Sequence, residues 1–237
     1  MKSNEKNVVI TSAVRTPVGI LGGSLKNIQG HILGSVVIKE VLKRSKIKSN
    51  DVDEVIMGQV LTGSAGQNPA RQAAIQAGLP IDKTAYVINQ VCGSGLRSVA
   101  AGYQAIMSND ASIIVAGGQE SMSNAPHAIN MRDGQKLEES KLVDTMIKDG
   151  LWDAFNGYHM GITAENVASK WQITRKDQDN FALSSQTKAE KAEKDGKFKN
   201  EIAPVVLKSE KGDSIFEIDE HPRAGITLET LARLDPV

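Results

Sequence analysis

The feature that most constrains this fold is the alternation of two apolar periods along residues 7–118. Short apolar runs rich in β-branched residues, typical of buried strands, alternate with stretches in which apolar residues recur every three or four positions, typical of helices. Because strands that alternate with helices build parallel sheets covered by helices, this order predicts an α/β fold with a mostly parallel sheet. The predicted strands are Asn7–Ala13, Val52–Leu61, Thr84–Val91 and Ser112–Ala116, and the predicted helices are Gly30–Ser45, Pro69–Gly78 and Ser94–Met107.

The pattern changes after Gly118, where a polar segment with no clear period follows, Ser121–Lys141. We interpret this segment as the start of an excursion from the sheet domain. The expected organisation is a sheet domain over residues 1–120 and an excursion domain over residues 121–237. Within the excursion we expect a charged helix from the capping box Thr174-x-x-Asp177 to Gly196, two strands over Glu201–Lys208 and Ser214–Asp219, and an amphipathic helix that begins within Gly225–Leu234.

The composition excludes several classes of function. Lys plus Arg and Asp plus Glu number 28 each, so the net charge is zero, and nothing indicates a nucleic-acid groove or a basic membrane surface. The start, Met1–Lys6, is polar, and we expect neither a signal peptide nor a spanning helix. The single cysteine excludes an intrachain disulfide and favours a reducing cytoplasm. No glycine pattern predicts a dinucleotide or phosphate loop, and we expect no metal site.

The one cysteine lies at a predicted junction of strand and helix. In the run NQVCGSGLR, Cys92 follows a predicted strand and precedes a predicted helix. The N–H groups and the dipole at a helix N-terminus favour an anion, so a thiolate is stabilised there, and the Cys92 N–H is available to an oxyanion. Gly93 and Gly95 permit a tight turn and the close approach of a substrate. The helix that follows is apolar on nearly every side, so we expect it to be buried all round.

Two interpretations of Cys92 stay open at this point. A lone cysteine is commonly a buried structural residue, whereas the strand–Cys–Gly-x-Gly–helix context fits a nucleophile. The remaining histidines give little further signal. We interpret His31 and His221 as surface residues, and the pair His159–Met160, taken alone, as packed core.

Six separated segments resemble the thiolase family, in the same order. The run NQVCGSGLRSV is similar to the family's nucleophile segment, and AVRTPVG, GQNPARQAA, AGGQESMSNAPH, GYHMGITAENVA and RAGITLETLARLDPV resemble others. The matches span essentially the whole chain and correspond to the family's amino-terminal part. The resemblance implies a thiolase-like fold of two similar halves, stacked as helix–sheet–helix–sheet–helix, of which this chain supplies the first half with the excursion inserted. It also implies that Cys92 is the acyl-accepting cysteine.

The same resemblance implies which residues contact the ligand. Leu151, Gln186 and Arg223 fall where thiolases contact coenzyme A, and Arg223 lies near the adenosine-phosphate end, where a guanidinium suits phosphate. Without the resemblance, Arg223 fits a solvated surface arginine. His159 and Met160 are implied to lie beside the thioester end, where Met160 shortens the acyl pocket in favour of acetoacetyl chains.

The implied activity is ping-pong acyl transfer among acetyl-CoA, acetoacetyl-CoA and coenzyme A. Coenzyme A is then a substrate, and no cofactor is expected. The resemblance further implies a role in fatty acid metabolism and a homotetramer, with His127 in the loop that builds it.

Several residues that the family uses are absent from this sequence. Thiolases supply a histidine in a Gly-His-Pro segment, a second cysteine in a Cys-x-Gly-Gly-Gly segment and an asparagine at an oxyanion site, all in the carboxyl-terminal half. We therefore expect a truncated chain that does not turn over alone, with one side of the helix after Cys92 open to water. Two alternatives remain: a non-catalytic remnant or one half of a split enzyme, and a ketoacyl synthase, which the GQESMSNAPH and GYHMG segments oppose. The side expected to be open bears Leu96, Val99, Tyr103 and Met107.

Overall fold

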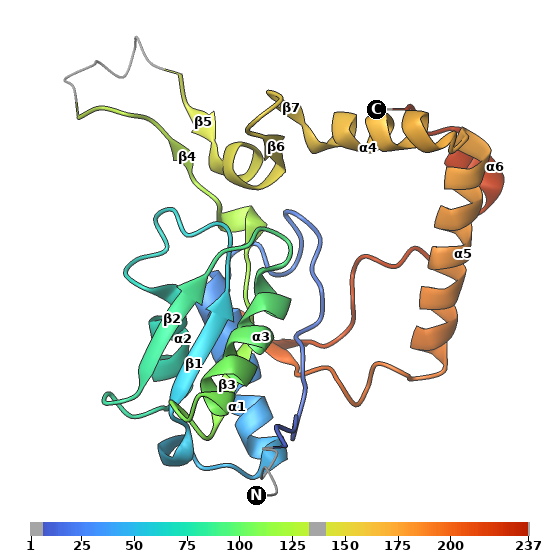
Figure 1. The fold of residues 1–237 in the computed structure, drawn as a ribbon. Coiled ribbons are helices and arrows are strands. Elements are labelled where there is room, and N and C mark those ends of the chain that lie inside the picture. Colours follow the sequence, from blue (N-terminus) through green and yellow to red (C-terminus); the bar gives the residue numbers. More distant parts are fainter. Residues whose placement is uncertain (1–6, 133–140, 237) are drawn as a thin grey trace, which may run out of the picture.

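The computed structural model describes residues 7–132 and 141–236 (Figure 1). Its centre is a parallel sheet of three strands in the order β2–β1–β3: β1 is Glu54–Gly58, β2 is Thr84–Ile88 and β3 is Ile114–Gly118. The sequence predicted the parallel sheet but not the order of its strands. Gly58 is level with Ile88 and with Gly118, so all three strands end at one edge. β1 and β2 are shorter than the apolar runs that predicted them, and β3 begins and ends two residues later than its predicted run.

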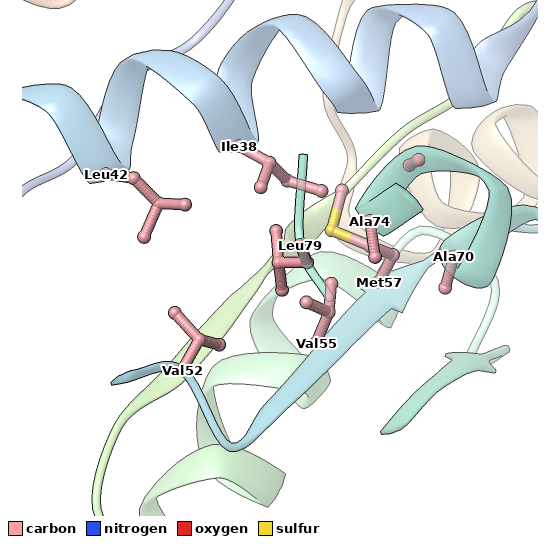
Figure 2. Packing of buried hydrophobic residues seen from close by; sticks show 9 residues of the cluster. Ile38, Leu42, Val52, Val55, Met57, Ala70, Ala74 and Leu79 are labelled. Carbon is pink, nitrogen blue, oxygen red and sulfur yellow. The ribbon is translucent and has the colours of Figure 1, made fainter. Parts of the chain in front are cut away.

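Helices cover both faces of this sheet. α1 (Gly30–Ser45) and α2 (Pro69–Gln76) pack on each other, and α3 (Ser94–Met107) packs against β1 and β3. α1 and α3 have the predicted bounds. Figure 2 shows Val55 and Met57 of β1 pointing toward Ile38 of α1 and Ala74 of α2. Because strand side chains alternate between faces, Val55 and Met57 share the face of α1 and α2. The other buried members of this cluster are Leu42, Val52, Ala70, Ala73 and Leu79.

The remaining elements lie mostly away from the sheet. α4 (Met160–Trp171) and α5 (Arg175–Lys194) form an outlying arch in Figure 1, and neither helix contains a buried residue. The predicted capping box is present, since Thr174 and Asp177 cap the start of α5 reciprocally. The predicted carboxyl-terminal helix is shorter than its pattern, as α6 is Leu228–Ala232. The short elements are η1 (Ser49–Asp51), η2 (Met122–Asn124), β4 (His127–Ala128), β5 (Val143–Asp144), η4 (Met146–Leu151), β6 (Trp152–Asp153), β7 (Tyr158–His159), β8 (Val205–Leu207) and β9 (Ser214–Phe216).

One segment of the outlying region returns to the sheet. The antiparallel pair β8–β9 was predicted, and its Val205 packs with Leu25 and Leu33 in a second small core. Arg15 reinforces this contact, because its guanidinium donates to Asp219 at 2.7 and 2.9 Å and to Glu201 at 2.6 Å. Residues 198–220 therefore connect the two parts of the molecule.

Three predictions about the sheet region are wrong. Asn7–Ala13 forms no strand, because no described strand pairs with it, and Ile10 is 77% exposed. His31 is buried rather than on the surface, since it shares a face of α1 with Ser35 and Ile38, and burial lowers the pKa of its imidazole. His221 is exposed as predicted.

The third concerns α3, which is not buried all round. No described element covers the side of α3 that bears Leu96, Val99, Tyr103 and Met107, and Leu96 is 78% exposed. The expectation that this side lies open to water is confirmed. Met1–Lys6 and residues 133–140 of the polar segment lie outside the described residues, so the predictions made for them stay predictions. Within the described residues, no helix combines the length and the apolar character needed to cross a bilayer.

Candidate active site

Cys92 lies at the edge of the sheet where the three parallel strands end. It comes four residues after β2, and Gly93 is the N-cap of α3. Its thiol is exposed, so the interpretation as a buried structural cysteine is wrong. The macrodipole of a 14-residue helix favours an anion at this position. The arrangement suits a thiolate that reacts with a ligand arriving from solvent.

The turn that holds Cys92 is closed by its own backbone. The Gly93 N–H donates to the Gln90 carbonyl at 3.1 Å, and the Ser94 N–H donates to the Val91 carbonyl at 3.1 Å. Between these bonds, Val91 has φ of 50°. A left-handed conformation is a genuine outlier for a β-branched residue, so the surrounding contacts must impose it. The turn is thus fixed rather than adaptable.

Glycines let the start of α3 lie directly on the sheet. A Cβ at Gly58 would come 2.4 Å from the Ser94 carbonyl carbon, and a Cβ at Gly118 would come 3.4 Å from the Gly95 Cα. Ser98, one turn further on, is fully buried, and its hydroxyl lies 2.7 Å from the Gly117 carbonyl oxygen. The helix that follows Cys92 is therefore anchored at the carboxyl ends of β1 and β3.

Two of the residues predicted to contact coenzyme A lie together on the outlying region. The Gln186 side-chain carbonyl on α5 accepts from the Arg223 N–H at 2.8 Å, and Glu190, one turn along, accepts from the Gly225 N–H at 3.2 Å. These bonds hold the loop at Arg223 against α5. Arg223 itself is exposed, so its guanidinium is accessible to an anionic ligand.

The other three predicted ligand contacts lie around the start of α4. Leu151 ends η4 and is half-buried, whereas His159 and Met160 are exposed, so the interpretation of this pair as packed core is wrong. His159 caps α4, since its Nδ1 accepts from the Gly161 N–H at 3.0 Å. Within the described residues, no hydrogen bond or ion pair joins Cys92 to any of the five predicted ligand contacts. The structure thus groups Gln186 with Arg223, and Leu151 with the start of α4, but it does not join either group to the thiol.

A buried polar cluster behind the strand ends was not predicted. The Gln119 amide donates to the Gln59 side-chain carbonyl at 2.9 Å, and the neighbouring Glu120 carboxylate accepts from the Val60 N–H at 2.8 Å. Burial raises the pKa of Glu120, although the backbone N–H groups it accepts from oppose this. The cluster fixes the segments that follow β1 and β3. Its sequence signal is the polar Gln59 after one apolar strand and Gln119-Glu120 after another.

The described residues contain no group of three or more His, Cys, Asp or Glu that could hold a metal ion. The chemistry that the arrangement supports follows from Cys92 and the helix that begins after it. A thiol at the end of a parallel strand, on a fixed turn before a helix, has the geometry of a covalent nucleophile.

Comparison with known proteins gives a consistent result. The family described as "Thiolase, N-terminal domain" matches residues 8–237. An acetyl-CoA acetyltransferase of Paracoccus denitrificans is 58% identical over 228 residues, which cover 96% of this chain and 58% of that protein. The cytosolic acetyl-CoA acetyltransferase of Rattus norvegicus is 49% identical over 236 residues, 100% of this chain and 59% of that protein.

A solved structure agrees with these relatives. The crystal structure of the Bacillus anthracis acetyl-CoA acetyltransferase superposes with a TM-score of 0.93 at 40% identity, covering 97% of this chain and 58% of that one. The chain thus spans somewhat less than three fifths of the length of these proteins. The expected thiolase-like α/β fold is confirmed over the part that matches.

Proposed function

The chain belongs to the thiolase family, and on that premise we propose that it supplies the acyl-accepting part of an acetyl-CoA acetyltransferase. The observation that supports this most strongly is the exposed Cys92 thiol, held on a fixed turn at the N-terminus of α3. In the proposed thiolysis, the thiolate attacks the 3-keto carbon of acetoacetyl-CoA. The bond between C2 and C3 breaks, acetyl-CoA leaves after taking a proton at C2, and the acetyl group remains on Cys92. A coenzyme A thiolate then removes it.

The proposed coenzyme A contacts are residues of the outlying region. The backbone N–H of Arg223 donates to the side-chain carbonyl of Gln186 on α5, which holds the exposed Arg223 at this helix. We assign Arg223 to the phosphate end of coenzyme A, and Leu151, His159 and Met160 to the thioester end. Met160 at the start of α4 favours short acyl chains in this assignment. Coenzyme A is a substrate here, and no further cofactor is proposed.

We propose that these 237 residues do not sustain turnover by themselves. The sequence contains one cysteine and no Gly-His-Pro segment, so a base for the Cys92 thiol and a second thiol for proton transfer are missing from it. The loss of a single oxyanion donor alone costs about 10²–10³ in rate. A single acetyl transfer onto Cys92 is the activity that remains.

A second candidate is that the chain works as one half of a split enzyme, completed by another polypeptide. The open side of α3 favours it, because Leu96 and Tyr103 are exposed in a helix that starts at the nucleophile. A thiolase carboxyl-terminal half, expressed separately, is the partner to test. The assembled enzyme is proposed to be a cytoplasmic homotetramer of fatty acid metabolism, in line with the family resemblance and the single cysteine.

The test is acetylation of Cys92 followed by a turnover assay. The purified chain is incubated with acetyl-CoA or acetoacetyl-CoA, and the acetyl group is located by mass spectrometry of the intact protein and its peptides. Cys92→Ala is the control, since it removes the only thiol. Thiolysis of acetoacetyl-CoA is then followed with the chain alone and with the separately expressed half. Absence of Cys92 acetylation with both acetyl-CoA and acetoacetyl-CoA would contradict the proposed function. Sustained turnover by the chain alone would contradict only the proposal that these 237 residues do not turn over by themselves.

A further inference from the structure

We infer that Ser94 is a positioning residue for the Cys92 thiol, and that it acts by holding Val91 in its left-handed conformation. The inference rests on the proposed function, because it assigns a role within the turn that accepts the acyl group. Ser94 does not face the ligand, since it is only 4% exposed. Its effect on the reaction must therefore pass through the backbone of the turn.

The hydroxyl of Ser94 makes two hydrogen bonds to the backbone around Val91, the residue with positive φ. Its Oγ accepts from the Gln90 N–H at 2.8 Å and donates to the Val91 carbonyl at 2.6 Å. In addition, the backbone N–H of Val91 donates to the Asn89 side-chain carbonyl at 2.9 Å. Two side chains and two backbone bonds thus close a turn of five residues. This accounts for a β-branched residue at φ of 50°, a conformation that its own side chain disfavours.

The position of Ser94 is itself fixed by the sheet. A Cβ at Gly58 would come 2.7 Å from the Ser94 Cβ, so the first residue of α3 lies directly on β1. Gly58 pairs in register with Ile88, the last residue of β2. The turn from Ile88 to Ser94 therefore spans two anchored points, and Cys92 lies between them. If the hydroxyl is lost, Val91 can relax to negative φ, and the residue that follows it moves relative to the N-terminus of α3.

Ser98 provides a matched control for this role. It is a buried serine in the same helix, and its hydroxyl lies 2.6 Å from the Gly95 carbonyl oxygen and 2.7 Å from that of Gly117. Removing either hydroxyl deletes a buried hydrogen bond near the nucleophile. Of these two serines, Ser94 is the one hydrogen-bonded to Val91, so Ser94→Ala should change the geometry of the thiol and Ser98→Ala should not.

The experiment compares Ser94→Ala with Ser98→Ala in the whole chain. We expect alkylation of Cys92 by iodoacetamide to become about tenfold slower in Ser94→Ala, the scale of one or two lost buried hydrogen bonds, and to stay within about twofold in Ser98→Ala. In single-turnover acetylation, the maximal rate should fall in Ser94→Ala while the acetyl-CoA concentration for half-maximal rate stays unchanged. Equal losses in the two variants would overturn the inference.

A second variant tests the strain itself and covers a Ser94→Ala chain that fails to fold. Glycine adopts positive φ about as readily as negative φ, so in Val91→Gly the hydrogen bonds of Ser94 are no longer needed to hold residue 91 at positive φ. The double variant V91G/S94A should alkylate within about threefold of V91G. A tenfold difference in alkylation rate between V91G and V91G/S94A would overturn the inference. If the Cys92 thiol of the parent chain reacts no faster than a free peptide cysteine and accepts no acetyl group, the proposed function fails instead, whatever Ser94 does.

Discussion

The sheet region and the outlying arch of this molecule are stabilised in different ways. In the sheet region, β1 contributes Val55, Ile56 and Met57, all fully buried between helices. In the arch, α4 and α5 bury no residue, and α5 relies on its capping box and on ion pairs between residues four apart, such as Arg175–Asp179. Such exposed pairs contribute only about 0.3–0.5 kcal/mol each. The proposed nucleophile, Cys92, therefore lies on the packed region, and the proposed coenzyme A contacts lie on the locally stabilised one.

The largest expected difference in the free energy of unfolding is between the substitution of a methionine in the core and that of a phenylalanine in the arch. Met57→Ala removes a buried side chain from the cluster in Figure 2 and should lower the free energy of unfolding by about 2–5 kcal/mol. Phe181→Ala, on α5, removes a larger side chain that is 77% exposed and should stay within about 0.5 kcal/mol. Urea denaturation followed by circular dichroism measures both. A comparable loss in Phe181→Ala would show that α5 is buried in solution, and the contrast between the regions would fail.

The second prediction concerns the connection between the regions. Arg15 donates to Asp219 and Glu201, so Arg15→Ala should destabilise the return of residues 198–220 by about 1–3 kcal/mol. Hydrogen exchange should rise in β8 and β9 but not in β1. Arg15→Lys keeps the charge without the planar two-point geometry, so it should recover only part of the loss. Uniform exchange across the molecule in Arg15→Ala would mean that the connection is not local.

The elements most fully predictable from the sequence were those with local signals at both ends. Gly30–Ser45 and Ser94–Met107 match α1 and α3 to the residue, because helical spacing and flanking turn residues mark where each helix begins and ends. Strand limits were less predictable. Pairing along β1 ends at Gly58, which depends on neighbouring strands rather than on the apolar run itself. Asn7–Ala13 shows the same limit, because an apolar run becomes a strand only where a partner strand is present.

The position of Cys92 before a helix was predictable from the sequence, but the geometry of its turn was not. The context of Cys92 indicated a helix N-terminus, and the structure confirms it. The left-handed conformation of Val91 had no signal in the sequence, since a β-branched residue predicts the opposite. His31 did have a signal that was missed, because it precedes Ser35 and Ile38 at the spacing of one helix face.

The third prediction tests whether the arch binds ligand despite its weak packing. Arg223→Ala should weaken coenzyme A binding by about 1–3 kcal/mol, toward the lower end because solvent screens an exposed charge. Isothermal titration calorimetry measures it in the purified chain. Arg132→Ala is the matched control, because Arg132 is also exposed but follows β4, a strand that lies away from α5 in Figure 1. Binding that is absent, or equally weakened in both variants, would remove the assignment of Arg223.

The smallest expected effect is the loss of the Arg15–Asp219 contact in acid. The Arg15 guanidinium, which donates to Asp219, holds the pKa of that carboxyl below its ordinary value of 3.8. A carboxyl whose pKa is lower in the folded state stabilises the fold above its unfolded pKa, and this contribution is lost as the pH falls through the folded pKa. The parent chain should therefore exceed Asp219→Asn in stability near neutral pH, and the difference should shrink below about pH 3.8.

Glu120 supplies a contrast of opposite sign within the same titration. Burial raises its pKa above the ordinary value of 4.5, so its ionisation costs stability as the pH rises through that range. Relative to Glu120→Gln, the parent chain should lose stability as the pH increases above about 4.5, whereas relative to Asp219→Asn it gains stability as the pH increases from below 3.8. Urea denaturation of the three chains across this range separates the two trends. A parent–Asp219→Asn difference that is independent of pH would show that Asp219 is not paired with Arg15, and that residues 198–220 are held to the sheet region by other contacts, among them the Arg15–Glu201 hydrogen bond and the packing of Val205.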